Sequence, residues 1–157
     1  VTNPGAATAS AWCFTLGLVA FVPFAVAMVS FADEGSRDAA LSGAALLSAG
    51  ALLNAAGTLA PIAAQHLERP VGEGALWASL LLDAAFNGFL GLALLLLTWS
   101  SRRSAPRGFT ALGFIAGLAS LPVVMEFTSA TAVTWLGVAG PLWLAWVTWA
   151  SIRVARG

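Results

Sequence analysis

Five long apolar segments, separated by short polar stretches, dominate the pattern of hydrophobic and polar positions along the chain. Each segment holds about 20 residues or more, which is the length that a helix needs to cross roughly 30 Å of hydrocarbon. We predict membrane-spanning helices at residues 12–32, 39–65, 76–99, 109–127 and 132–152. The pattern therefore predicts a polytopic membrane protein with five transmembrane helices.

The apolar segments are predicted to be helices rather than strands. In lipid, every backbone N–H and C=O group must find a partner within its own segment or in a closed barrel. Barrel strands alternate apolar and polar residues, whereas the run from Leu92 to Leu97 is apolar on every side. The predicted fold class is all-α, a single transmembrane helix-bundle domain over residues 1–157 with no room for a soluble domain.

Polar residues mark the predicted connections between the spans. The first connection is the charged turn at 33–38, the third is the stretch at 100–107, and the fourth is the short turn at 128–131. The second, at 66–74, holds Pro70 and two glycines, which favour a loop. The first span is longer than a signal-peptide core of about 7–15 residues and follows no basic segment, so we expect it to be retained as a helix.

The arginines predict the orientation of the helices, because positive charge is retained on the cytoplasmic side of a membrane. With five spans, one side receives Arg69 alone. The other side receives Arg37, Arg102, Arg103, Arg107, Arg153 and Arg156. A missed or added helix would scramble this alternation. We therefore predict an N-terminus outside and a C-terminus in the cytoplasm.

The composition agrees with a lipid environment. Hydrophobic residues make up 59% of the 157 residues and charged residues only 9%, against roughly 25% charged residues in a soluble domain. Seven basic and seven acidic residues give a net charge of zero, so no basic surface is predicted for nucleic-acid phosphates. We expect a multi-pass protein of the plasma membrane, with lipids and no nucleic acid as partners.

Several kinds of chemistry lack the residues that they need. The chain contains no lysine, which excludes a lysine Schiff base, and one cysteine, Cys13, permits no internal disulfide and no cysteine cage for a metal. One histidine, His66, is too few for bis-histidine haem ligation within the chain. No hydrolase, metalloprotease or phosphate-binding motif is present. We predict no catalytic residues and no metal site, identify no cofactor, and rank a membrane enzyme last among the functions.

Asp83 is the strongest candidate for a functional residue. An ionisable side chain inside hydrocarbon costs at least about 2.5–3.5 kcal/mol at the centre of a membrane, so each one suggests a site. Asn87 lies one turn further along the same helix face, and Thr58 and Asn54 repeat this spacing on the preceding helix. When depth in the membrane is counted from residue 65 of the second helix and residue 76 of the third, Thr58 lies opposite Asp83 and Asn54 lies opposite Asn87. These four side chains are predicted to form a polar ladder between two antiparallel helices.

Two further titratable residues, His66 and Glu126, are predicted near the outer ends of the second and fourth helices. The outer halves of three helices also contain prolines, which bend helices: Pro61, Pro122 and Pro141. One interpretation is an outward-facing polar pocket that binds a small ligand, a cation or a proton, as in a transport-like or sensory module. The alternative is a structural or regulatory membrane subunit without its own ligand, in which the intramembrane polar residues clamp helices together.

Glycines are predicted to mark where helices approach closely, because small residues allow close packing in lipid. Gly43, Gly50 and Gly57 are spaced seven apart and line one stripe of the second helix, and Gly113 and Gly117 form a GxxxG motif on the fourth. Both patterns serve packing within one chain or contact with a partner equally well. A homo-oligomer or another membrane protein is therefore kept as a partner.

The second half of the chain resembles a family of known sequences. Phe86 to Ala93 (FNGFLGLA), LGFIAG at 112–117 and GPLWLAW at 140–146 resemble a family of small, uncharacterised membrane proteins of high-GC actinobacteria. The resemblance covers roughly residues 76–157. It implies an actinobacterial source and a polytopic membrane protein, and because the family has no assigned activity it implies no mechanism.

Overall fold

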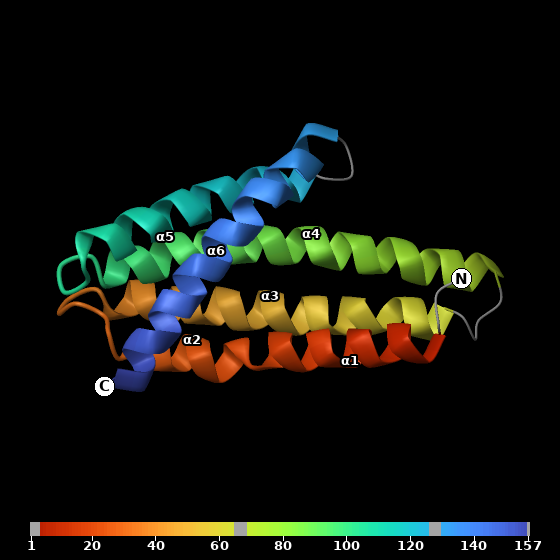
Figure 1. Ribbon diagram of the computed structural model, residues 1–157, viewed down its shortest axis with the longest axis horizontal. Coiled ribbons are helices and arrows are strands. Elements are labelled where there is room, and N and C mark those ends of the chain that lie inside the picture. Colours follow the sequence, from red (N-terminus) through yellow and green to blue (C-terminus); the bar gives the residue numbers. More distant parts are fainter. Residues whose placement is uncertain (1–3, 65–68, 126–129, 157) are drawn as a thin grey trace.

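The computed structural model is all-helical over the residues it describes, which are 4–64, 69–125 and 130–156. Side chains are described for residues 8–64, 71–125 and 134–156. The elements are α1 (Pro4–Val19), α2 (Phe21–Val29), α3 (Arg37–Ala64), α4 (Arg69–Ser100), α5 (Arg107–Ser120), the 3₁₀ helix η1 (Leu121–Met125) and α6 (Ala130–Arg156). Figure 1 shows α1 beginning and α6 ending at opposite ends of the bundle.

Five helical stretches of the described chain are long and apolar enough to cross a membrane. They are Thr8–Val29, Arg37–Ala64, Val71–Ser100, Arg107–Met125 and Thr134–Arg156. Large apolar side chains are exposed along them, as Leu16 (65% exposed), Trp77 (64%) and Leu81 (61%) illustrate. The predicted all-helical fold with five such helices is confirmed for the part of the chain that the structure describes.

The predicted loop at 66–74 is wrong for residues 69–74, because α4 begins at Arg69. Pro70 is the second residue of α4, in the first turn, where a missing N–H removes no helical hydrogen bond. Gly72 lies close to the carbonyl oxygen of Ala64, which would be 3.0 Å from a Cβ at this position. The chain therefore reverses direction between α3 and α4 in fewer residues than the sequence predicted.

The first span is not one continuous helix. α1 ends at Val19 and α2 begins at Phe21, with Ala20 between them. Pro23 cannot donate the backbone hydrogen bond that the carbonyl of Val19 would accept in a regular helix. A similar change occurs in the fourth span, where α5 gives way to the 3₁₀ helix η1 and Pro122 lacks the same donor. Both irregularities therefore lie within four residues of a proline, whereas Pro61 and Pro141 lie inside the continuous helices α3 and α6.

The helices pack around a central antiparallel pair, α3 and α4. The pieces α1 and α2 pack on α3, whereas α5 and η1 pack on α4. Figure 1 shows α6 crossing the bundle obliquely, and α6 contacts α5, η1 and α2. The C-terminal hairpin therefore joins the rest of the bundle through α4 and, across the bundle, through α2.

The glycine stripe of α3 is the surface on which α4 packs. A Cβ at Gly50 would lie 2.8 Å from Cβ of Phe89, and a Cβ at Gly57 would lie 3.0 Å from Cβ of Leu82. Gly43 meets Leu97 in the same way, at 3.0 Å. Only glycine allows this approach of two helices. The stripe is buried within the chain and is not open to a second copy.

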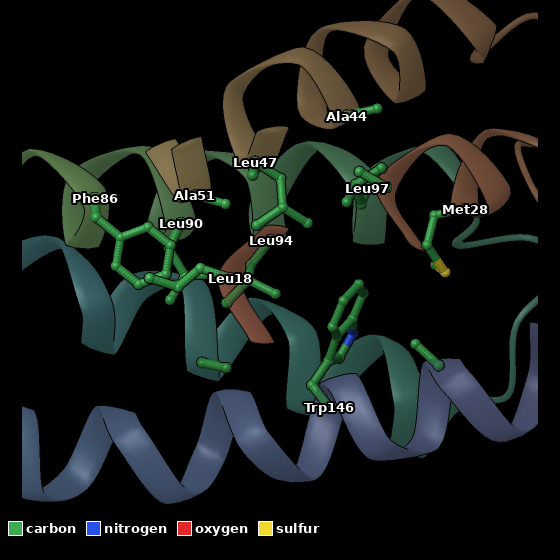
Figure 2. Packing of buried hydrophobic residues seen from close by; sticks show 14 of the residues in the cluster. Leu18, Met28, Ala44, Leu47, Ala51, Phe86, Leu90, Leu94, Leu97 and Trp146 are labelled. Carbon is green, nitrogen blue, oxygen red and sulfur yellow. The ribbon is translucent and has the colours of Figure 1, made fainter. Parts of the chain in front are cut away.

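The core of the bundle centres on Trp146 of α6, which is fully buried. Its ring stacks on Phe109 at a centroid distance of 5.2 Å and meets Phe24 edge-on at 6.4 Å. Figure 2 shows Trp146 projecting from α6 toward the other helices, where Leu94 and Leu97 of α4 lie. These contacts connect α2, α4, α5 and α6, so this aromatic cluster joins the two halves of the sequence.

Candidate functional site

The predicted polar ladder contains one hydrogen bond between helices. The amide Nδ2 of Asn54 on α3 donates to Oδ1 of Asp83 on α4 over 2.9 Å. Asn54 is buried and Asp83 is half-buried. The bond fastens α3 to α4 within two helices that are long and apolar enough to span a membrane.

The other two members of the ladder bond to their own helices. Oγ1 of Thr58 donates to the carbonyl of Asn54 over 2.8 Å, and Nδ2 of Asn87 donates to the carbonyl of Asp83 over 3.0 Å. The predicted pairing of Thr58 with Asp83 is therefore wrong by about one helical turn. Because α4 begins at Arg69 and not near residue 76, residues 65 and 76 are a poor reference for equal depth.

A cavity of about 460 Å³ lies between α1 and α3, on the side of Thr58. It is lined by Thr8, Ser10, Ala11, Phe14, Thr58, Pro61 and Ile62. Thr58 is the one predicted site residue in this lining, and Asp83 does not take part in it. His66 and Glu126, the other residues assigned to the outer pocket, lie outside the described residues.

A larger cavity, of about 840 Å³, lies at the opposite end of α3. It is formed by α2, the connection that follows α2, and the first turns of α3. Its lining consists of Val26, Val29, Ser30, Ala32, Asp33, Glu34, Gly35, Arg37, Leu41, Ala44, Ala45 and Ser48. The sequence did not predict this cavity, because its two walls and its mouth become neighbours only when α2 folds back on α3.

Asp33 joins two connections that are distant in the sequence. Its carboxylate accepts hydrogen bonds from the backbone N–H of Arg103 at 2.8 Å and of Ser104 at 2.9 Å. Its own backbone N–H donates to the carbonyl of Ser100, at the end of α4. Asp33 is 9% exposed. This residue therefore ties the α2–α3 connection to the α4–α5 connection.

The environment of Asp33 shifts the pKa of its carboxyl. Burial alone would raise the pKa, but the backbone N–H groups of Arg103 and Ser104, the hydroxyl of Ser104 and the charge of Arg102 together outweigh burial. The pKa consequently lies below its ordinary value of 3.8. The charged form is the one that these groups stabilise.

A tight turn positions Asp33 for these bonds. The N–H of Ser36 donates to the carbonyl of Asp33 over 2.9 Å, and Gly35 within this turn has φ of 80°. Glycine adopts that left-handed conformation without a steric penalty. Asp33 was missed as a site residue because a charged turn after an apolar span is an ordinary signal, and its partners lie about 70 positions further along the chain.

Six arginines gather at the same end of the bundle as Asp33. They belong to the α4–α5 connection, to the first residues of α3 and α5, and to the end of α6: Arg37, Arg102, Arg103, Arg107, Arg153 and Arg156. Two of them cover aromatic rings. The guanidinium of Arg102 lies 3.7 Å from the ring centroid of Trp99, and that of Arg153 lies 5.1 Å from the centroid of Phe109.

Two buried polar groups meet at Gly113. The hydroxyl of Thr98 on α4 and the indole N–H of Trp146 on α6 are both fully buried, and neither has a hydrogen-bond partner among the residues that the structure describes. Both atoms lie where a Cβ of residue 113 would stand, and Nε1 of Trp146 would be 2.5 Å from it. Gly113 therefore makes room for side chains from two neighbouring helices.

The chemistry available at these sites is hydrogen bonding and charge. Among the residues that the structure describes, no group of three or more His, Cys, Asp or Glu is placed to hold a metal ion, and Cys13 is an exposed free thiol. No family model, curated protein or solved structure compared with the chain matches it. The arrangement of these residues carries the functional argument.

Proposed function

We propose that the protein is a multi-pass protein of the plasma membrane, with its N-terminus outside and its C-terminus in the cytoplasm. Five apolar helices of sufficient length support insertion, and the six arginines at one end support the orientation. Reporter fusions at the two ends of the chain test it. The proposal requires a cytoplasmic signal from the C-terminal fusion alone, and a signal from both fusions contradicts it.

Within the membrane, the protein acts as a non-enzymatic structural or regulatory subunit, in which Asp83 and Asn54 clamp α3 to α4. The observation that carries this proposal is the 2.9 Å hydrogen bond between their side chains. Side-chain hydrogen bonds between membrane helices contribute about 0.6 kcal/mol on average and up to about 1.7 kcal/mol. A homo-oligomer or a membrane-protein partner remains a prediction, and so does the actinobacterial resemblance.

A second candidate function is the binding of a proton, a cation or a small polar ligand at Asp83. Asp83 is the one carboxylate in the middle part of the described spans, and its side-chain hydrogen bond with Asn54 uses only Oδ1. The next turn of α3 carries Thr58, which lines the outer cavity between α1 and α3. A ligand in that cavity would be about one turn away from the Asn54–Asp83 pair.

Substitutions separate the two functions. If the two residues form a clamp, Asp83→Leu and Asn54→Leu should each lower the free energy of unfolding by about 1 kcal/mol. The double variant should lose no more stability than either single variant, because each substitution alone already breaks the bond. Thermal unfolding in detergent measures this, with Thr58→Val as a control that removes only a bond within α3. Additive losses would contradict the clamp.

The ligand-binding function is tested with Asp83→Asn, which keeps the shape of the side chain and removes its charge. If Asp83 binds a proton or cation, this variant folds normally and loses the pH-dependent or cation-dependent binding that titration calorimetry measures for the wild type in detergent. If the variant binds like the wild type, the second function is wrong.

A further inference from the structure

The large cavity between α2 and α3 has apolar walls and a polar mouth. The apolar walls come from two membrane-spanning helices: Val26 and Val29 of α2, and Leu41, Ala44 and Ala45 of α3. The polar lining gathers at the connection between them: Ser30, Asp33, Glu34, Gly35 and Arg37. Ser48 lies about three helical turns beyond Arg37. The cavity thus extends along α3 from a charged mouth into the apolar part of the bundle.

The cavity is open at its side, toward the surface that would face lipid. Val26 is 64% exposed and Leu41 is 50% exposed, whereas Ala44 between the helices is only 6% exposed. The volume of about 840 Å³ falls within the range of about 300–1,000 Å³ that small-molecule sites occupy. An apolar chain can therefore enter from the membrane between α2 and α3 and lie on Ala44.

The mouth presents one positive and one negative side chain. Arg37 and Glu34 are both exposed, and neither side chain forms a hydrogen bond or ion pair with the described residues. Asp33 is already engaged, because its carboxylate accepts the backbone N–H groups of Arg103 and Ser104. A headgroup at this mouth meets a guanidinium, which suits a phosphate, and a carboxylate, which suits an ammonium group.

We propose that this cavity binds an aminophospholipid of the surrounding leaflet, such as phosphatidylethanolamine. Its phosphate lies on Arg37, its ammonium group on Glu34, and one acyl chain between Val29 and Ala44. A lipid with a net negative headgroup satisfies Arg37 but is repelled by Glu34. The proposal rests on the membrane insertion proposed above, and failure of that insertion shows separately, as a chain that stays soluble without detergent.

Native mass spectrometry of the full chain in detergent tests the proposal, with phosphatidylethanolamine and phosphatidylglycerol added at equal concentrations. The wild type should retain phosphatidylethanolamine in preference. Arg37→Gln should bind both lipids about tenfold more weakly, which corresponds to the loss of one charge-assisted contact. Glu34→Gln should weaken phosphatidylethanolamine binding and leave phosphatidylglycerol binding equal or stronger.

Two further variants control for side effects. Ala45→Trp fills the cavity and should reduce the binding of both lipids, whereas Arg107→Gln removes an exposed arginine at the same end that does not line the cavity and should change neither. If Ala45→Trp does not fold, the two variants at the exposed mouth decide the question. The proposal is overturned if the wild type retains the two lipids equally. It is also overturned if Arg37→Gln and Glu34→Gln both bind the lipids as the wild type does.

Discussion

Replacing Asp33 by alanine should destabilise the protein more than any other substitution in the charged turn. The change removes two hydrogen bonds to a carboxylate, of 2.8 and 2.9 Å, each worth about 1.5–3 kcal/mol. Both donors lie in a connection at the surface of the bundle, so water replaces part of the loss. We expect a decrease of about 3 kcal/mol in the free energy of unfolding for Asp33→Ala, and about half of it for Asp33→Asn, which keeps one acceptor.

The same residue predicts a dependence on pH. Because the pKa of Asp33 in the folded protein lies below 3.8, protons bind more readily to the unfolded chain. The stability that Asp33 contributes is therefore complete above about pH 4 and is lost as the pH falls through the folded pKa. Asp33→Asn should lose less stability than the wild type over this acid range.

Thermal unfolding in detergent, followed by circular dichroism, measures both effects. A loss of about 3 kcal/mol corresponds to a decrease in Tm of roughly 6–12 °C for a chain of this size. Glu34→Ala is the matched control, because Glu34 is the exposed neighbour of Asp33, and its Tm should stay within about 2 °C of the wild type. If Asp33→Ala and Glu34→Ala melt at the same temperature, the role assigned to Asp33 is refuted.

Two glycine substitutions give further expectations for the same assay. Gly113→Ala should lower the free energy of unfolding by about 1–3 kcal/mol or more, because its Cβ would collide with Thr98 and Trp146. The control is Gly137→Ala, whose Cβ would meet no atom within 4 Å, and which should be neutral or stabilising by up to about 1 kcal/mol. Equal melting temperatures of the two variants would contradict the packing at Gly113. Gly35→Ala should cost about 1–2 kcal/mol, because an L-residue is strained at φ of 80°, and an unchanged Tm would contradict that turn.

The sequence predicted the features that depend on residues close together in the chain. Span number and helical character follow from the length of the apolar runs, and the shared face of Asp83 and Asn87 follows from their separation by one helical turn. The glycines of α3 share one stripe for the same reason, and that stripe packs on α4. Local periodicity was sufficient for each of these predictions.

Features that depend on how distant segments meet could not be predicted. The register between α3 and α4 depends on where α4 begins, and a proline in the first turn of a helix, as Pro70 is, cannot be told from a proline in a loop by composition. The partners of Asp33 are two backbone N–H groups, which carry no residue-specific signal. The cavity at Arg37 requires the fold of α2 against α3, so its lining residues are dispersed among ordinary apolar positions.

The hydrogen bonds of Asp83 and those of Asp33 join different parts of the bundle. Asn54 and Asp83 join α3 to α4, which glycine packing already brings into close contact along much of their length, so their bond adds to an interface that exists without it. Asp33 instead joins the α2–α3 connection to the residues that lead into α5, at the end where Trp146 and Phe109 pack. Loss of Asp33 should therefore loosen the α5–α6 hairpin, and loss of Asp83 should leave that hairpin in place. Hydrogen exchange of α5 in the two variants distinguishes these outcomes, and equal protection of α5 in both would show that the hairpin is held by the aromatic core alone.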